Sequence, residues 1–308
     1  MALRVAVVGS GSLGIYYGTR LALSGLDVSF LMRHDYLAVK QSNKLVLHRE
    51  AHIDYLTPVN VFTSTKDIGP VDLVLIAIKT TANHALRDLI SPLIKESTIL
   101  LTVQNGLGSD TLLSEIFGSD RIVGGLAFIA TNRIAPGEVK CFHPGSLTIG
   151  DYNHSLRVRT NEIAELFLKA GIKTRTVENL DSARWHKLVW NIPFNGLTIA
   201  HGGITTDKVC ADPLLKEEVK ALMREVQLAA SYFGHTISDD FLHQQFDVTP
   251  PMGAYKPSSL VDYLSGKEIE IESIWGEPLR RAAKAGAQLP RLENLYKSLK
   301  VISSGKTK

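Results

Sequence analysis

Residues 3–14 read LRVAVVGSGSLG, an apolar strand pattern that runs straight into a glycine loop. The loop fits G-x-G-x-x-G, follows a predicted strand at residues 3–8 and opens a helical pattern at residues 13–24, which is the context that a dinucleotide-binding loop requires. The first glycine would make the tight turn, the second would let the backbone approach a pyrophosphate, and the third would allow close helix-to-strand packing. Amides at the helix start would then face the phosphates. The residues expected to bind the cofactor are Gly9, Ser10, Gly11, Ser12, Leu13 and Gly14; a purely structural turn is the alternative.

Short β-rich runs alternate with helical patterns through the first half of the chain. The predicted strands are residues 3–8, 27–32, 73–77 and 98–103, and the predicted helices are residues 13–24 and 81–90. This alternation is typical of a parallel sheet with crossover helices. We therefore expect an α/β fold that begins with a Rossmann-type, doubly wound domain.

Two stretches of the first half have a different pattern. Alternating apolar residues at 44–63 and 122–150 look like antiparallel inserts. Turn-forming residues stand at 135–137 (Ala-Pro-Gly) and at 143–145 (His-Pro-Gly), and we expect the chain to turn at both places.

The second half is dominated by long helical patterns from about Asn179 onward. Asp212 followed by Pro213 predicts a helix start, because Asp is a good N-cap acceptor and Pro suits the first helical position. Further helices are predicted at residues 274–285 and 291–301. The predicted domains are thus a Rossmann-type domain at residues 1–178 and an all-helical domain at residues 179–308.

Composition narrows the class of protein. Lys and Arg total 34 against 31 Asp and Glu, so the net charge of +3 gives no electrostatic case for nucleic-acid binding. No apolar run is long enough to span a membrane. Cys141 and Cys210 are too few for a disulfide framework and suit a reducing compartment. No leader pattern precedes the first strand, so we expect a cytoplasmic protein. The ten histidines show no metal-ligand spacing, and no metal is expected.

The end of the second predicted strand bears on the choice of cofactor. An acidic residue there would bind the adenosine ribose 2′-hydroxyl of NAD(H) and repel the 2′-phosphate of NADP(H). The sequence has Arg33 and His34 instead, and the first carboxylate is Asp35. Arg33 can pair with a phosphate through two parallel hydrogen bonds. NADP(H) is therefore favoured; the alternative for Arg33 is a solvated surface charge.

A polar stripe runs along an otherwise apolar helix in the second half. Lys187, Asn191 and Asn195 are spaced i, i+4, i+8, which puts them on one helix face. Polar groups within a buried helix cost stability unless they find partners, so the stripe indicates a site. An exposed face with ordinary Lys and Asn is the alternative. Pro193 is expected to kink the helix within the stripe.

Several motifs in order along the chain resemble the ketopantoate reductase (2-dehydropantoate 2-reductase) family. They are the N-terminal glycine loop, Lys79 at the end of the 71–78 run, QNGLG at 104–108, the Lys-x-x-x-Asn-x-x-x-Asn helix, SSLVD at 258–262 and EIESIWG at 270–276. The resemblance covers essentially the whole chain.

The resemblance implies a reaction and a set of roles. Such enzymes use NADPH to reduce 2-dehydropantoate, a small 2-keto acid, to pantoate for pantothenate and coenzyme A synthesis. Lys187 matches the catalytic general acid and Glu270 the acidic residue that holds the substrate. The matching substrate-binding positions are Asn105, Asn191, Asn195 and Ser258. The positions expected near the cofactor are Arg33, Lys79 and again Asn105, which also meets the nicotinamide.

Some alternatives stay open. Glu268 and Glu272 alternate with Glu270 and apolar residues, a pattern also typical of a solvated strand edge, so which of the three faces the site is not decided. Trp275 and Gly196 depart from the family pattern beside the predicted substrate site, so a different 2-keto acid is one alternative. A non-catalytic NADP(H)-binding regulator is another. Family members occur as monomers and dimers, and a homodimer is one of the expected states.

Overall fold

The computed structural model describes residues 3–50, 52–153 and 155–305, and the chain forms two compact units. The first comprises Met1–Gln104 and Ser109–Leu180, and the second Asn105–Gly108 and Asp181–Lys308. The change of unit at Leu180 lies two residues beyond the predicted boundary at residue 178. The short segment Asn105–Gly108, which the prediction gave to the first domain, groups with the second unit instead.

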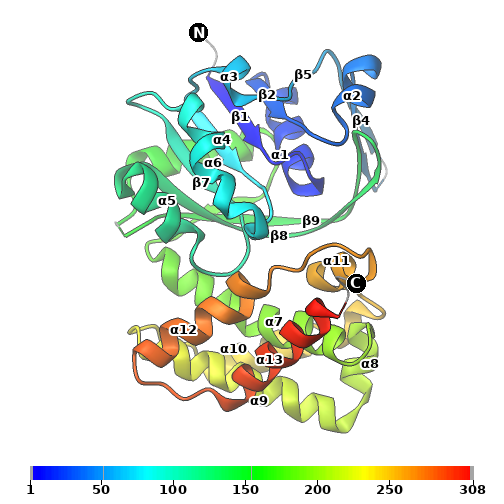
Figure 1. Ribbon diagram of the computed structural model, residues 1–308, viewed down its shortest axis with the longest axis vertical. Helices are drawn as coiled ribbons and strands as arrows, with labels where there is room; N and C mark the ends of the chain where they lie inside the picture. The colour runs from blue at the N-terminus through cyan, green and yellow to red at the C-terminus, as the bar shows by residue number, and fades with distance from the viewer. Residues whose placement is uncertain (1–2, 51, 154, 306–308) are drawn as a thin grey trace. The chain divides into compact units, whose positions relative to one another are not determined.

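The described part of the first unit is built on one sheet of ten strands (Figure 1). The strands are β1 (Arg4–Val8), β2 (Asp27–Leu31), β3 (Leu45–Arg49), β4 (His52–Leu56), β5 (Asn60–Phe62), β6 (Leu73–Ile76), β7 (Ile99–Thr102), β8 (Ile122–Ala135), β9 (Glu138–Asp151) and β10 (Thr174–Thr176). Their order is β4-β3-β9-β8-β7-β6-β1-β2-β5, and β10 pairs with β9. The pairs from β5 through β2, β1, β6 and β7 to β8 are all parallel, which confirms the Rossmann-type fold.

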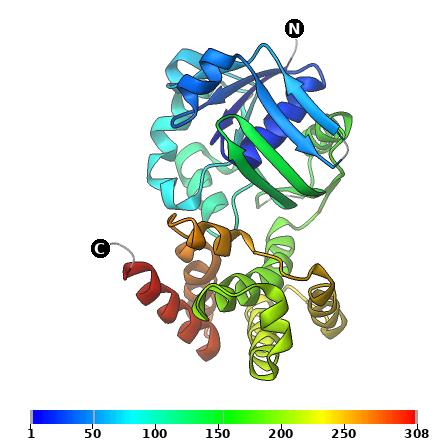
Figure 2. The same ribbon diagram turned by 90° about the vertical axis from the view of Figure 1, so that its right-hand side faces the viewer.

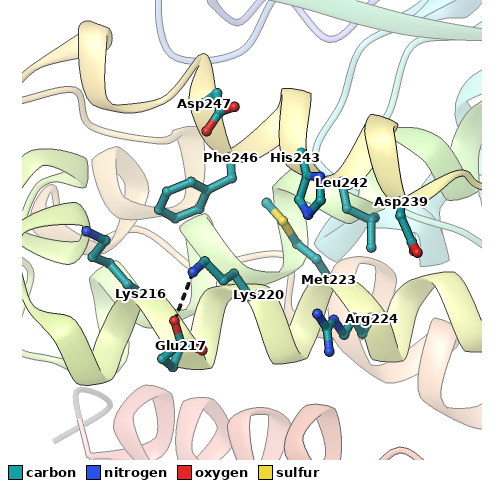
Figure 3. A pocket seen from close by; sticks show the side chains of 10 residues that line it. All are labelled: Lys216, Glu217, Lys220, Met223, Arg224, Asp239, Leu242, His243, Phe246 and Asp247. Atoms are coloured by element: carbon teal, nitrogen blue, oxygen red, sulfur yellow. Dashed lines mark hydrogen bonds and ion pairs between the residues drawn. The ribbon is translucent and has the colours of Figure 1, made fainter.

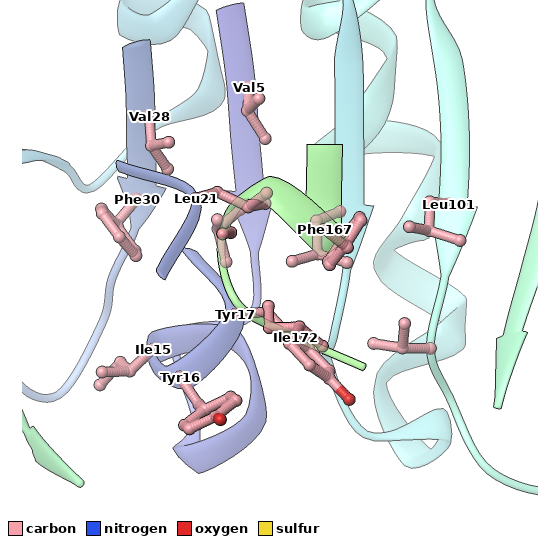
Figure 4. Packing of buried hydrophobic residues seen from close by; sticks show 14 of the residues in the cluster. Val5, Ile15, Tyr16, Tyr17, Leu21, Val28, Phe30, Leu101, Phe167 and Ile172 are labelled. Carbon is pink, nitrogen blue, oxygen red and sulfur yellow. The ribbon is translucent and has the colours of Figure 1, made fainter. Parts of the chain in front are cut away.

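Helices cover both faces of this sheet. They are α1 (Ser12–Leu23), α2 (Tyr36–Ser42), α3 (Thr65–Ile68), α4 (Leu86–Ile90), α5 (Ser109–Phe117), α6 (Val158–Lys169) and the 3₁₀ turns η1 (Thr80–Ala85), η2 (Ser91–Leu93) and η3 (Ser119–Arg121). Because strand side chains alternate between faces, Val5 and Val7 join one core with α1 and α6, shown in Figure 4, whereas Ala6 and Val8 join another with α4 and α5. Strands buried on both faces explain the nearly continuous apolar runs in the sequence.

The two predicted inserts are antiparallel pairs, β3 with β4 and β8 with β9. The predicted turn at residues 135–137 is confirmed, with Gly137 at a φ of 71°. The predicted turn at residues 143–145 is wrong: β9 continues through it, and the pairing with β8 shifts register between Phe128 and Ala130 instead of reversing direction. The local turn residues were thus accommodated as a bulge in a long strand.

The helix predicted at residues 81–90 is also only partly present. The chain forms the 3₁₀ turn η1 over Thr80–Ala85 and becomes α-helical only at Leu86–Ile90. None of the η1 side chains is buried, so this segment lacks the apolar face that stabilises a longer α-helix.

The second unit is helical and contains no strand between Asp181 and Gly305, as Figures 1 and 2 show. Its elements are α7 (Leu180–Ala200), α8 (Thr206–Ala211), α9 (Pro213–Ser231), α10 (Asp239–Asp247), the 3₁₀ turn η4 (Pro250–Met252), α11 (Ser258–Leu264), the π-helix η5 (Glu272–Gly276), α12 (Glu277–Lys284) and α13 (Pro290–Ser304). The predicted start of α9 is confirmed, because Asp212 accepts hydrogen bonds from the amides of Leu214 and Leu215. Within the described residues, no helix has the length and hydropathy needed to cross a membrane.

Candidate active site

The glycine loop has the geometry that its sequence predicts. Gly9 has a φ of 109°, and a Cβ there would lie 2.3 Å from the backbone nitrogen of Ile78. A Cβ at Gly14 would lie 2.0 Å from the carbonyl oxygen of Gly9, so close packing of α1 requires glycine here. A Cβ at Gly11 would meet nothing within 4 Å. The loop is thus tightly packed at its two ends and open in the middle.

The start of α1 fits a diphosphate. Gly11 is the N-cap and provides no side-chain cap, and the first turn of α1 carries no acidic residue. Amides at such a helix start combine with the positive end of the helix dipole to attract anions. The hydroxyl of Ser10 donates a 2.8 Å hydrogen bond to the carbonyl of Leu31, which ties the loop to the end of β2. These residues could therefore hold the pyrophosphate of a dinucleotide.

Just beyond β2 the chain has an exposed arginine, Arg33, and a buried carboxylate, Asp35. Arg33 is exposed, two residues past the end of β2. Asp35 is only 8% exposed, and its carboxylate accepts hydrogen bonds from Arg133 Nη1 at 3.0 Å and from the Gly137 amide at 3.1 Å. Arg133 belongs to β8, and the sequence reasoning did not consider it because the two partners are 98 residues apart.

Gln104 connects the ends of β6 and β7. Its Nε2 donates to the carbonyl of Ile78 at 3.0 Å and to Asn83 Oδ1 at 2.8 Å, while its Oε1 accepts from Thr102. Lys79, the predicted phosphate ligand, is the exposed residue between Ile78 and the turn that holds Asn83. Gln104 therefore supports the segment that carries Lys79. It lies in the quoted QNGLG motif, but the sequence alone assigned it no role.

In the second unit, the structure brings Lys187 and Asn105 together. Lys187 Nζ donates a 2.9 Å hydrogen bond to Asn105 Oδ1. The loop of Asn105 is itself fixed, because the amide of Leu107 donates to the carbonyl of Ser273 at 2.9 Å. Arg184, one turn before Lys187 on α7, donates to the carbonyl of Gly106 at 3.5 Å. The sequence reasoning did not identify Arg184 or Ser273; only the folded chain places them beside this loop.

The two asparagines of the stripe differ in their surroundings. Asn195 is 1% exposed; its Nδ2 donates to the backbone carbonyl of Asn191 at 3.1 Å, and its Oδ1 accepts from the amide of Ser259 at 2.9 Å. For Asn195, the exposed-face alternative is therefore wrong. Asn191 is half-buried. Ser258, a predicted substrate ligand, is exposed at the start of α11, next to Ser259. Pro193 does not end α7, which continues to Ala200.

The charge state of Lys187 is unusual for a lysine. Burial, reinforced by the positive charge of Arg184, lowers the pKa of its ammonium to about 7, while the negative charge of Glu270 acts in the opposite direction. Burial removes water from the charged form and so favours the neutral amine. A lysine with this pKa is half protonated near neutral pH and can both give and accept a proton.

Glu270 is the buried member of the acidic trio, at 4% exposure. Glu268 is exposed, and Glu272 forms ion pairs with Arg280 and Lys300 on its exposed side. The strand-edge alternative is wrong, because the segment enters a helix at Ile271 and continues as the π-helix η5. π-Helical turns often occur at functional sites.

Trp275 and Gly196 form one packed unit within the helical core. Trp275 is completely buried, and its indole Nε1 donates a 3.0 Å hydrogen bond to the carbonyl of Ile192. A Cβ at Gly196 would lie 3.0 Å from that nitrogen and 2.6 Å from Leu295 Cδ2. Glycine at position 196 thus makes room for the indole of Trp275.

A groove of about 620 Å³ lies between α9 and α10 (Figure 3). Its lining residues are Lys216, Glu217, Lys220, Met223, Arg224, Asp239, Leu242, His243, Phe246 and Asp247. None of the predicted site residues belongs to this set. Among the described residues, no three His, Cys, Asp or Glu side chains are grouped so that they could hold a metal ion.

Comparison with known proteins covers both halves of the chain. The family profile described as Ketopantoate reductase PanE/ApbA matches residues 5–154, and the profile Ketopantoate reductase PanE/ApbA C terminal matches residues 179–303. A 2-dehydropantoate 2-reductase of Nostoc sp. is 37% identical over 305 residues, covering 97% of this chain and 95% of the relative.

Solved structures show the same relationship. The structure of 2-dehydropantoate 2-reductase from Geobacter metallireducens superposes with a TM-score of 0.94 at 40% identity, covering 97% of this chain and 99% of that one. A D-mandelate dehydrogenase solved with NADH and anilino(oxo)acetate has a TM-score of 0.91 over 99% of this chain and 100% of that one, but at 19% identity the likeness concerns the fold alone. The chain belongs to the ketopantoate reductase family and is an oxidoreductase that acts on a CH–OH group.

Proposed function

We propose that this protein reduces 2-dehydropantoate to pantoate with NADPH, in the synthesis of pantothenate and coenzyme A. The observation that carries the proposal is the hydrogen bond of Lys187 to Asn105 in surroundings that lower the pKa of the lysine to about 7. A general acid is most effective when its pKa is close to the working pH. In this proposal, residues 1–178 bind the cofactor and residues 179–308 supply the substrate-binding and catalytic helices.

The cofactor proposal rests on the first unit. The open position at Gly11 and the uncapped start of α1 suit the pyrophosphate of a dinucleotide. Arg33 would pair with the 2′-phosphate of NADPH, since the first carboxylate after β2 is buried against Arg133. Lys79 would add a second cation near the phosphates. The complete set of proposed cofactor ligands is Gly9, Ser10, Gly11, Ser12, Leu13, Gly14, Arg33, Lys79 and Asn105.

NADPH held by the proposed cofactor ligands would supply the hydride for the keto carbon, and this chain must supply a proton to the keto oxygen. Lys187 Nζ is the proposed donor, because negative charge grows on that oxygen as the C–H bond forms. Asn105 Oδ1 accepts a hydrogen bond from the ammonium and so fixes the direction of the lysine. The lysine is left neutral after the transfer, a state that its burial favours.

The remaining polar groups would hold the substrate. Glu270 is the proposed anchor for the hydroxyl end of ketopantoate, and its negative charge also helps to keep Lys187 protonated. Asn191, Asn195 and Ser258 complete the proposed substrate site. Asn195 would also orient the start of α11, through its contact with the amide of Ser259.

The sequence suggested a different 2-keto acid as an alternative because of Trp275 and Gly196. Both residues are accounted for by core packing, so they give no reason to prefer a different 2-keto acid. We place the enzyme in the cytoplasm, where its two free thiols would stay reduced.

The deciding experiment follows the loss of NADPH absorbance with purified protein. Ketopantoate is compared with a panel of other 2-keto acids that includes the aryl keto acid corresponding to mandelate, and each is repeated with NADH. We expect rapid turnover of ketopantoate with NADPH. If only another keto acid is turned over, the proposed substrate is wrong but the proposed reaction type stands. Binding of NADPH without turnover of any acid would favour the non-catalytic regulator.

A further inference from the structure

We infer that Arg133 is a determinant of the preference for NADPH, because it neutralises Asp35, the first carboxylate after β2. The inference rests on the proposed use of NADPH. It concerns a residue on β8, far in sequence from the strand end where the adenosine ribose of a Rossmann fold is bound.

The carboxylate of Asp35 accepts hydrogen bonds from two groups of the β8–β9 hairpin. Its Oδ1 accepts from Arg133 Nη1 at 3.0 Å, and its Oδ2 accepts from the amide of Gly137 at 3.1 Å. The residue is 8% exposed, so the carboxylate is largely withdrawn from solvent. Both oxygens are therefore engaged on the side of the hairpin.

The local sequence alone would predict another orientation. Asp35 is the N-cap of α2, where an aspartate normally accepts hydrogen bonds from the helix's own first amides, but its side chain makes no such bond. The contact with Arg133 and Gly137 has replaced the cap. The carboxylate of Asp35 is thus held by the hairpin and not by the helix that it precedes.

The ion pair between Asp35 and Arg133 changes the electrostatic potential near the proposed phosphate site. Asp35 stands two residues after Arg33, the proposed ligand of the 2′-phosphate. An uncompensated carboxylate here would repel the phosphate, since charges interact over roughly 10 Å at 0.1 M salt. Arg133 cancels that charge, and with 38% of its side chain exposed it also adds positive potential to the surface. NADH, which lacks the phosphate, should not respond to either charge.

The test measures binding of NADPH and of NADH to the whole protein without substrate, by cofactor fluorescence. Arg133→Gln should weaken NADPH binding about tenfold and leave NADH binding within about twofold. Adding Asp35→Asn to that variant should restore NADPH binding. Asp35→Asn alone should bind NADPH at least as tightly as the unmodified protein. The matched control is Arg157→Gln, which removes another partly exposed arginine paired with an aspartate, Asp120, and should change neither affinity.

Three results would overturn the inference. If Arg133→Gln weakens the binding of NADPH and of NADH equally, the ion pair has a purely structural role. The same follows if Asp35→Asn fails to restore NADPH binding, or if NADPH binding is weaker in Asp35→Asn alone. If the unmodified protein does not prefer NADPH, the proposed cofactor itself is wrong, which is a separate outcome read from the unmodified protein.

Discussion

Lys187 is the residue on which the proposed chemistry depends, and its pKa of about 7 makes a directional prediction. The reduction needs the ammonium form, so kcat should be high below pH 7 and fall as the pH rises through about 7. Lys187→Met should lower kcat by at least about a hundredfold while NADPH still binds. Lys208→Met, at an exposed lysine of α8, is the control and should keep full activity. Full activity in Lys187→Met would remove the lysine from the mechanism.

The two charged neighbours of Lys187 should move its pKa in opposite directions. Arg184 from α7 lowers the pKa and Glu270, from the segment before η5, raises it. Arg184→Gln should therefore shift the basic limb of the pH–rate profile to higher pH, and Glu270→Gln should shift it to lower pH. Arg184→Lys keeps the charge and should leave the limb near its original place. Shifts in the same direction for both glutamine variants would contradict this electrostatic account.

At the scale of single elements, helix α9 depends on its N-cap. Asp212 accepts from the amides of Leu214 and Leu215, so Asp212→Ala should reduce the free energy of unfolding by about 1 kcal/mol. Asp212→Asn is the control, because asparagine caps helices about as well. Urea unfolding followed by circular dichroism measures the difference. Equal stability of the alanine and asparagine variants would show that the cap contributes nothing.

The loop of Asn105 depends on a glycine that cannot be replaced. Gly106 has a φ of 78°, and a Cβ there would lie 2.1 Å from the carbonyl oxygen of Ser273. Gly106→Ala should therefore displace Asn105 and lower kcat sharply. Gly266→Ala is the control: its φ of 65° imposes a similar backbone cost of about 1 kcal/mol, but nothing lies within 4 Å. Similar kcat values in the two variants would contradict the role of close packing.

At the scale of the whole molecule, cofactor binding and stability are linked. A ligand that binds only the folded chain stabilises it by about 2.7 kcal/mol at a concentration of 100 times Kd. NADPH should therefore raise the thermal unfolding temperature more than NADH at equal concentration, and Arg157→Gln should behave like the unmodified protein. Differential scanning fluorimetry measures the shift. A larger shift with NADH would contradict the cofactor proposal.

Patterns that act over a few residues were readable from the sequence. The glycine loop, the alternation of strands and helices, the antiparallel inserts and the cap at Asp212 all follow from local propensity and periodicity. These features predicted the fold class, whereas the resemblance to the family rested on the ordered motifs from the glycine loop to residues 270–276. The turn predicted at residues 143–145 was wrong because long-range pairing outweighed local preference: β8 holds β9 in a strand despite the turn-forming residues.

The site needed the tertiary structure, because its properties depend on burial and on partners far apart in the chain. Lys187 meets Asn105 across 82 residues, and Asp35 meets Arg133 across 98. Glu270 is distinguished from its two acidic neighbours only by its burial. The sequence by itself determined which residue types are present and at what spacing. Only the folded chain decided which of them are desolvated, since desolvation and opposing charges set a pKa and neither is a property of local sequence.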